Sequence, residues 1–134
     1  MLHAGDVGSP DVLAALSRIA PVVAVRGNID RDEWARRLPV AAEIEIDGVR
    51  FHIVHILDRL DVDPVATGIH VVLFGHSHVP SVATRDGVLL VNPGSAGPRR
   101  FALPVTVGLL EIEGGRPRAR IVPLALEGTV RASE

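Results

Sequence analysis

The chain has 134 residues, no cysteine, a formal net charge of -2 and a hydrophobic content of 47%. This length suits one domain with a buried core, and the lack of cysteine excludes disulfides and thiolate metal ligands. Mixed charges without a basic block disfavour nucleic acid and membrane surfaces as partners, and short apolar runs without a signal-peptide pattern predict a cytoplasmic protein.

The first elements along the chain are predicted to be a strand, a helix and a second strand. Residues 1–4 and 22–25 are short apolar runs of the kind found in buried strands. Residues 9–19 begin with an N-cap serine and a proline, and their apolar residues recur at helical spacing. We expect this helix to pack on the sheet as a parallel crossover, followed by a short helical piece over 32–37.

The rest of the chain is predicted to form antiparallel hairpins around one more buried strand. Residues 43–55 alternate polar and apolar side chains around Asp47-Gly48, which is typical of a two-residue hairpin turn. A weak helix over 58–67 and a buried strand over 71–74 follow. Similar turn signals predict two further hairpins, which pair 82–84 with 88–91 and 105–111 with 118–124.

Four short polar signatures follow these apolar runs: Gly5-Asp6, Gly27-Asn28-Ile29-Asp30, His55 and Gly75-His76-Ser77-His78. Open α/β sheets carry their ligand sites beyond the carboxyl ends of their strands, so four such ends can bring these side chains together. Carboxylate, amide and imidazole donors predict a divalent metal site of nitrogen and oxygen ligands. Asp6 is the candidate to bridge two ions, because its two oxygens can serve one ion each.

Each signature also has a structural interpretation. Gly-Asp and Gly-Asn-x-Asp are frequent in turns, and Asp30 is suited to cap the helix that follows it. Three histidines lie inside apolar runs and are interpreted as structural: His3, His52 and His70. The two histidines of Gly-His-Ser-His are different, because they follow a buried strand and have little structural reason to be there.

Phosphate binding is predicted beside the metal ligands. Arg99 and Arg100 offer guanidinium groups, and the backbone amides of the Gly94-Ser95 turn are further donors for a phosphate oxygen. Asn28 is expected to contact both the metal and the phosphate.

In their order along the chain, the four signatures and Asn92-Pro93-Gly94-Ser95 resemble the calcineurin-like metallophosphoesterase superfamily. The likeness is to its small bacterial and archaeal phosphodiesterase branch, and it covers the whole chain. It implies an α/β fold, a four-layer αββα sandwich, and hydrolysis of small-molecule phosphodiesters by a metal-activated water. The metal implied is manganese or nickel, with iron, cobalt or zinc as alternatives.

The resemblance also implies a role for each candidate residue. Asp6 would bridge two metal ions, Asn28, His55 and His76 would complete the second metal site, and His78 would belong to the first. The residues implied to be catalytic are the four of the second site: Asp6, Asn28, His55 and His76.

Two departures from the family pattern affect these expectations. Family members begin with a strand ending in Asp-x-His and a helix, which supply two ligands of the first metal. This chain starts after that point, so we expect an N-terminally incomplete domain over 1–134, from a start codon assigned too late, with a one-metal or weakened centre. The unpaired sheet edge would favour a homo-oligomer. Apolar Ile29 and Ile56-Leu57 disfavour a general acid at those positions.

Three functions remain open on the sequence. The leading one is a metal-dependent phosphodiesterase. The alternative is a non-catalytic interaction module, since a retromer subunit of the same fold works by surface binding. A third is a metal-binding or sensing protein that uses Asp6, Asn28, His55 and His76, although it would leave the Asn92–Ser95 loop and both arginines without a role.

Overall fold

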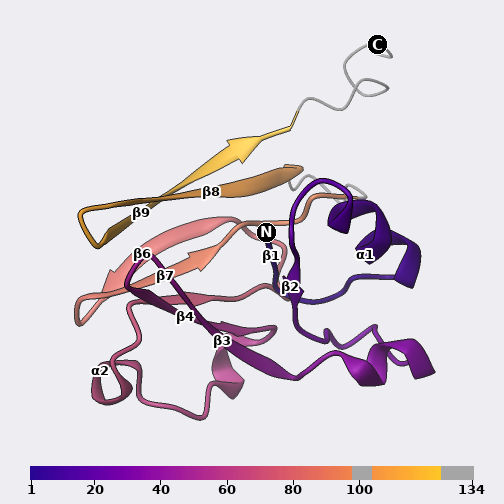
Figure 1. The fold of residues 1–134 in the computed structure, drawn as a ribbon, viewed down its shortest axis with the longest axis horizontal. Coiled ribbons are helices and arrows are strands. Elements are labelled where there is room, and N and C mark those ends of the chain that lie inside the picture. The colour runs from indigo at the N-terminus through magenta and orange to yellow at the C-terminus, as the bar shows by residue number, and fades with distance from the viewer. Residues whose placement is uncertain (98–103, 125–134) are drawn as a thin grey trace.

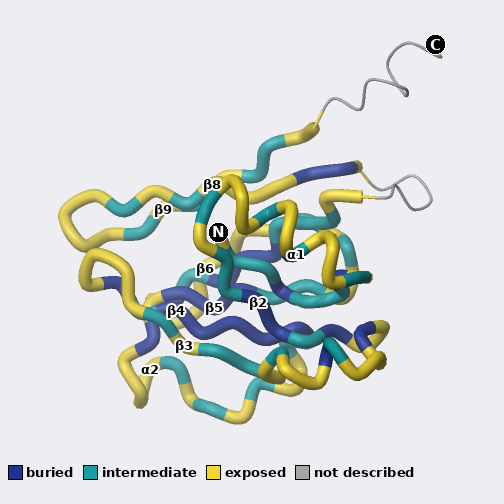
Figure 2. Tube along the Cα trace, turned by 45° about the vertical axis from the view of Figure 1, so that its right-hand side comes forward, coloured by how far each residue is buried: buried dark blue, intermediate teal, exposed yellow. Residues whose placement is uncertain are grey.

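A five-stranded mixed sheet forms the centre of the structure (Figure 1), a computed structural model that describes residues 1–97 and 104–124. Its strands are β3 (Ala41–Ile46), β4 (Val49–Val54), β5 (Val71–Leu73), β6 (Ser81–Arg85) and β7 (Val88–Asn92), in the order β3-β4-β5-β7-β6. Strands β4, β5 and β7 run parallel, and the antiparallel strands β3 and β6 form the two edges. The three central strands are the most buried part of the chain, as Figure 2 shows.

Two smaller sheets pack on one face of the central sheet. One is the parallel pair β1 (Leu2–His3) and β2 (Val23–Ala24), and the other is the antiparallel hairpin β8 (Thr106–Glu113) and β9 (Arg116–Pro123). Residues of both sheets contact the buried cluster around Phe51 and Ile53, among them Leu2, Val23, Leu110 and Ile112. Two β layers therefore enclose the main core, and the predicted α/β fold is confirmed.

The opposite face of the central sheet is covered by the segment between β4 and β5. It contains a short 3-10 helix, η2 (Leu57–Arg59), and α2 (Pro64–Thr67). We expected one helix over 58–67, and the structure breaks it in two. The reason is Pro64, which disfavours helical conformation at Asp63, so Asp63 stays extended and caps the second helix with its side chain.

The predicted helix between the first two strands is present and only partly covered. Helix α1 (Pro10–Ser17) is shorter than expected and has no buried residue, and Ile19 beyond its end is 76% exposed. Leu13 and Leu16, on the face expected to pack, are half-buried, so the packing expected for this helix is only partial. The adjoining strands β1 and β2 have two residues each, so they offer too little surface to bury an amphipathic helix. The second short piece, η1 (Glu33–Arg37), is a 3-10 helix.

The hairpin turns agree with the sequence. At both Asp-Gly turns the aspartate and the glycine have positive φ, with Asp47 at 49° and Asp86 at 53°. Such values are what a two-residue hairpin turn requires at both central positions. Within residues 1–97 and 104–124, no helix is long and apolar enough to cross a membrane.

Candidate metal centre

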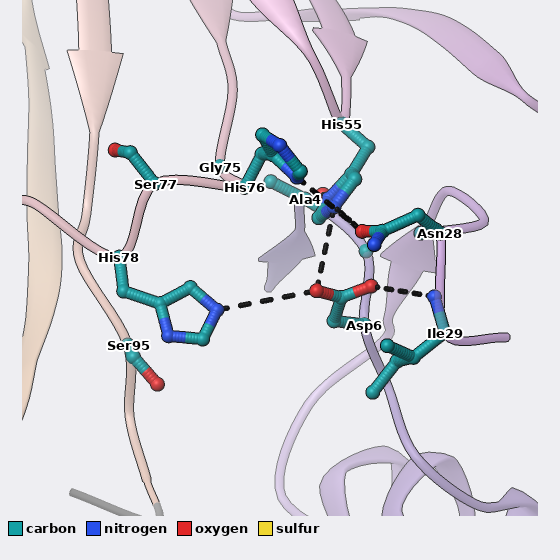
Figure 3. A network of polar contacts seen from close by, with 12 residues as sticks. Ala4, Asp6, Asn28, Ile29, His55, Gly75, His76, Ser77, His78 and Ser95 are labelled. Atoms are coloured by element: carbon teal, nitrogen blue, oxygen red, sulfur yellow. Dashed lines mark hydrogen bonds and ion pairs between the residues drawn. The ribbon is translucent and has the colours of Figure 1, made fainter. Parts of the chain in front are cut away.

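The four polar signatures meet at one place in the fold, beyond the carboxyl ends of β1, β2, β4 and β5 (Figure 3). The strand ends belong to two different sheets, whereas the sequence suggested a single one. Asp6 and Asn28 come from the small parallel sheet, and the histidines come from the central sheet. The two sides are joined directly where Nδ1 of His55 lies 2.7 Å from the carbonyl oxygen of Ala4.

This contact determines where the proton of the His55 ring lies. The oxygen of Ala4 only accepts, so Nδ1 of His55 must donate to it, and in the neutral ring Nε2 carries a lone pair. Nε2 lies 2.8 Å from Oδ1 of Asn28 and 3.4 Å from Oδ2 of Asp6. Three electron-pair donors thus face one another without a hydrogen between them. A cation, a second ring proton, or the other orientation of the Asn28 amide, which turns its Nδ2 toward His55, would each relieve this contact.

His76 and His78 approach the same cluster from the next loop. Nδ1 of His76 lies 3.3 Å from Oδ1 of Asn28, and Nε2 of His78 lies 3.9 Å from Oδ2 of Asp6. In Figure 3, the Asp6 carboxylate lies between His78 on one side and His55 with Asn28 on the other. All five candidate ligands therefore form one group, with the carboxylate at its centre.

The backbone is strained at three of these five residues. Asp6, His76 and His78 have φ values of 57°, 71° and 64°, a left-handed region that costs non-glycine residues free energy. Among the described residues, the other non-glycine positions with positive φ are the two hairpin aspartates. Strain outside ordinary turns is thus concentrated in this cluster, which is typical of functional sites.

Asp30 braces this site, and the sequence did not indicate that role. The residue is 3% exposed, and its carboxylate accepts hydrogen bonds from backbone amides of both ligand loops: Val7 (3.0 Å), Gly8 (3.0 Å) and Gly27 (2.9 Å). The expectation that Asp30 caps the following helix is wrong. The N-cap residue of η1 is Asp32, and its side chain makes no capping hydrogen bond. Burial favours a higher pKa for Asp30, but the amides outweigh it and hold the pKa below its ordinary value.

The loops of Asp6 and Asn28 touch so closely that only glycine fits between them. A Cβ on Gly27 would overlap both the backbone nitrogen and Oδ1 of Asp6. Oδ1 of Asp6 also accepts a hydrogen bond of 3.2 Å from the amide of Ile29. One carboxylate oxygen is thus held by the neighbouring loop, and the other faces the imidazoles.

The remaining histidines make local hydrogen bonds, as their structural interpretation expects. Nδ1 of His3 accepts from the Gly5 amide at 3.2 Å, and burial lowers the pKa of His3 against the opposing charges of Asp30 and Asp6. The other two make similar bonds, His52 with Glu43 at 3.1 Å and His70 with the Arg50 amide at 2.9 Å.

The predicted phosphate donors are only partly described. Arg99 and Arg100 lie outside the residues that the structure describes. The amide of Gly94 donates to Oδ1 of Asn92 at 3.0 Å and is not free to bind phosphate, so the expectation is wrong for Gly94, and for the Ser95 amide it stays a prediction.

The donor set fits a divalent cation. It offers one carboxylate, one amide oxygen and imidazole nitrogens, and a cation among Nε2 of His55, Oδ1 of Asn28 and Oδ2 of Asp6 would relieve their contact. In the part of the chain that the structure describes, no group of three or more His, Asp or Glu side chains is arranged closely enough to hold a metal ion. The fit therefore rests on donor chemistry and on the contact without a proton.

Comparisons with known proteins agree on one family. Residues 1–115 match the model of the calcineurin-like phosphoesterase superfamily domain. A probable metallophosphoesterase of Methanothermobacter thermautotrophicus is 34% identical over 129 residues, which are 91% of this chain and 74% of the relative. A phosphodiesterase of Methanocaldococcus jannaschii is 28% identical over 127 residues, 84% of this chain and 76% of the relative.

The fold also occurs in a solved structure with a bound metal. Vps29 from Entamoeba histolytica, complexed with zinc, superposes with a TM-score of 0.69 and 20% sequence identity. The match covers 91% of this chain and 80% of that one. At this identity the likeness concerns the fold.

Proposed function

This chain belongs to the calcineurin-like phosphoesterase superfamily, and from that premise we propose that it is a metal-dependent phosphodiesterase acting on small-molecule phosphodiesters. The observation that carries the proposal is the Asp6 carboxylate, whose Oδ2 lies 3.4 Å from one imidazole and 3.9 Å from another on its other side. A carboxylate in this position suits a bridging ligand. The named phosphodiesterase relative supports the choice of reaction.

The proposed ligands are the five residues of the cluster: Asp6, Asn28, His55, His76 and His78. When bound, divalent ions would polarise a phosphoryl oxygen and lower the pKa of a water molecule, so that it loses a proton and can attack phosphorus as hydroxide. Manganese is the metal that the family resemblance implies, and the nitrogen and oxygen donors also suit nickel, iron, cobalt or zinc. A centre with two ions stays a prediction, because the described ligands of the first site are only Asp6 and His78.

The protein groups have separable tasks in this proposal. Asp6 supplies negative charge at the centre, and the bond from His55 to the Ala4 carbonyl keeps Nε2 turned toward the cluster. Asn28 presents its oxygen beside His55 and His76, where it can contact both metal and substrate. Arg99 and Arg100 remain proposed phosphate contacts.

Substitution of the central carboxylate tests the proposal. Asp6→Asn keeps the shape of the side chain and removes its charge, so Mn²⁺-dependent hydrolysis of bis(p-nitrophenyl) phosphate by the purified chain should fall at least about 100-fold. Asp86→Asn is the matched control, because Asp86 also has positive φ but lies in a hairpin turn. Hydrolysis that persists in Asp6→Asn would exclude Asp6 as the bridging ligand.

A second candidate is a non-catalytic interaction module on the same fold. The observation in its favour is α1, whose apolar residues are exposed or only half-buried. Such a module would bind Mn²⁺ through the cluster and hydrolyse no phosphodiester, which the same assay with a parallel Mn²⁺ titration distinguishes. A cytoplasmic location and a homo-oligomer formed through the edge of β1 also remain proposals, the first supported by the cysteine-free composition.

A further inference from the structure

Asn92 is a fully buried polar residue whose partners all lie in loops near the cluster. It is the last residue of β7 and is 0% exposed. Its Nδ2 donates to the carbonyl oxygen of Gly75 and to the hydroxyl of Ser77, both at 3.2 Å. Its Oδ1 accepts from the amide of Gly94 at 3.0 Å. Both ends of the amide group are thus in use.

The atoms that Asn92 holds lie on either side of His76. The loop adds two bonds of its own, from the Ser77 amide to the Gly75 carbonyl at 2.9 Å and from the Val79 amide to the Ser77 hydroxyl at 3.2 Å. In Figure 3, the side chain of Ser77 points away from Asp6. These hydrogen bonds therefore hold the loop on the side opposite the cluster.

The segment held by these hydrogen bonds is also the part of the loop whose backbone is strained. His76 and His78, on either side of Ser77, are the two residues of the loop with positive φ. Residues held there require surroundings that fix the conformation, because the unrestrained chain prefers negative φ. A buried group with two donors and one acceptor can supply that restraint from one position.

We propose that Asn92 is the positioning residue of the His76–His78 turn. Its amide holds the strained turn so that both imidazoles face Asp6 and Asn28, and its loss lets the turn relax. The geometric part of this inference stands on the contacts of Asn92 alone. Its consequence for metal affinity rests on the proposed function.

Asparagine is the residue type that this position requires. Aspartate would lose both donors and bury a charge against the Gly75 carbonyl, and a leucine would remove the hydrogen bonds that Gly75, Ser77 and Gly94 make to this side chain. Thr106 gives a matched control in the same region. It is 2% exposed and its hydroxyl donates to the Pro93 carbonyl at 2.7 Å, one residue from Asn92, without a hydrogen bond to the histidine loop.

The first test is made by NMR on the metal-free full chain. Positive φ brings the amide and α protons of one residue together, so His76, His78 and Asp6 should each show a strong intraresidue NOE. In Asn92→Ala the NOE should weaken at His76 and His78 and persist at Asp6, while Thr106→Val should leave all three strong. Persistence at both histidines in Asn92→Ala, or equal loss in Thr106→Val, would overturn the proposal.

The second test titrates Mn²⁺ into the same variants. Partners behind metal ligands typically change affinity about 10- to 100-fold, so Asn92→Ala should bind Mn²⁺ at least about tenfold more weakly than Thr106→Val. Equal affinities would overturn the link to the metal site. A wild-type chain that binds no Mn²⁺ would refute the proposed function, and the NOE pattern would still decide the positioning role.

A milder variant covers the case in which Asn92→Ala does not fold. Ser77→Ala removes one exposed hydroxyl, which accepts from both Asn92 and Val79. The NOE of His78 should weaken in this variant, and that of Asp6 should not. An unchanged NOE at His78 would contradict the proposal that the hydrogen bond from Asn92 to Ser77 holds the turn.

Discussion

Both sides of the cluster hold strained backbone, and each does so with a different buried hydrogen-bonding side chain. The Asp6–Asn28 side belongs to a sheet of two short strands, and the His76–His78 side belongs to the five-stranded sheet. Each side holds non-glycine backbone at positive φ. The first is braced by a buried carboxylate, Asp30, and the second by a buried neutral amide, Asn92.

The difference follows from how much support each sheet gives. Val71 and Val72 of β5, which leads into the histidine loop, are both 0% exposed, so that loop starts from a rigid strand. Strand β1, which leads to Asp6, has two half-buried residues, and the neighbouring helix α1 buries none. Charge-assisted hydrogen bonds are stronger than neutral ones. The weaker sheet is therefore held by the stronger kind of brace, and this side should be the more sensitive to substitution and to acid.

The largest effect is expected at the glycines that precede the ligands. Gly27→Ala should destabilise the chain by roughly 3 kcal/mol, because the new Cβ meets backbone atoms of Asp6 that cannot rotate away. Gly75→Ala on the other side should cost much less, since its Cβ would lie 3.4 Å from the nearest atom, the Ala4 carbonyl oxygen.

Urea unfolding of both variants, with Mn²⁺ titrations, measures this contrast. Gly27→Ala should also lose Mn²⁺ affinity, because Asp6 and Asn28 move apart. Equal stabilities of the two variants would show that the two sides do not differ in their tolerance.

The carboxylate brace should be the next most sensitive feature. Asp30→Asn removes charge from three hydrogen bonds in a buried place, so the free energy of unfolding at pH 7 should fall by about 2 kcal/mol. Asp32→Asn is the control, since Asp32 is exposed and makes no side-chain capping bond. Denaturant unfolding at pH 7 measures both, and comparable losses would contradict the bracing role.

The same brace predicts an acid dependence. The folded pKa of Asp30 is below its ordinary value of 3.8, so its stabilising contribution is complete above that value. The contribution is lost as the pH falls through the lower, folded pKa. Unfolding measured from pH 6 to pH 2 should therefore show a smaller acid loss in Asp30→Asn than in the wild type. Thr106→Val should keep the wild-type slope.

The smallest effect is expected at Ile29, between Asn28 and Asp30. Its side chain is 60% exposed, and its contact with Asp6 is made by the backbone amide. Ile29→Ser should change the free energy of unfolding by no more than about 0.5 kcal/mol and leave Mn²⁺ affinity unchanged. A tenfold change in affinity would mean that the side chain itself shapes the centre.

Local features of the fold were predictable from sequence because neighbouring residues determine them. The Asp47-Gly48 and Asp86-Gly87 turns need positive φ at two adjacent positions, and the residue types reveal it. The apolar runs likewise located the strands of the central sheet, and the polar residues after them located the cluster.

The braces were not predictable, because their partners are distant in the sequence. Asp30 bonds to amides 22 and 23 residues away, and Asn92 to atoms 15 and 17 residues away. Locally, Asp30 has the pattern of a helix cap, and only the contact of the two loops gives it another role. The partial burial of α1 is also a tertiary property, since its apolar spacing is that of a packed helix.

The His55–Ala4 bond has a consequence for the order of folding. It joins residues 51 positions apart, whereas the hairpins β3-β4, β6-β7 and β8-β9 pair neighbours across short turns. Closing long loops costs more chain entropy, so the hairpins should form early and the cluster late. A metal bound to the finished cluster would then slow unfolding and leave the folding rate nearly unchanged. The metal would therefore lengthen the lifetime of the folded chain, and this protection would appear in the unfolding rate rather than in the folding rate.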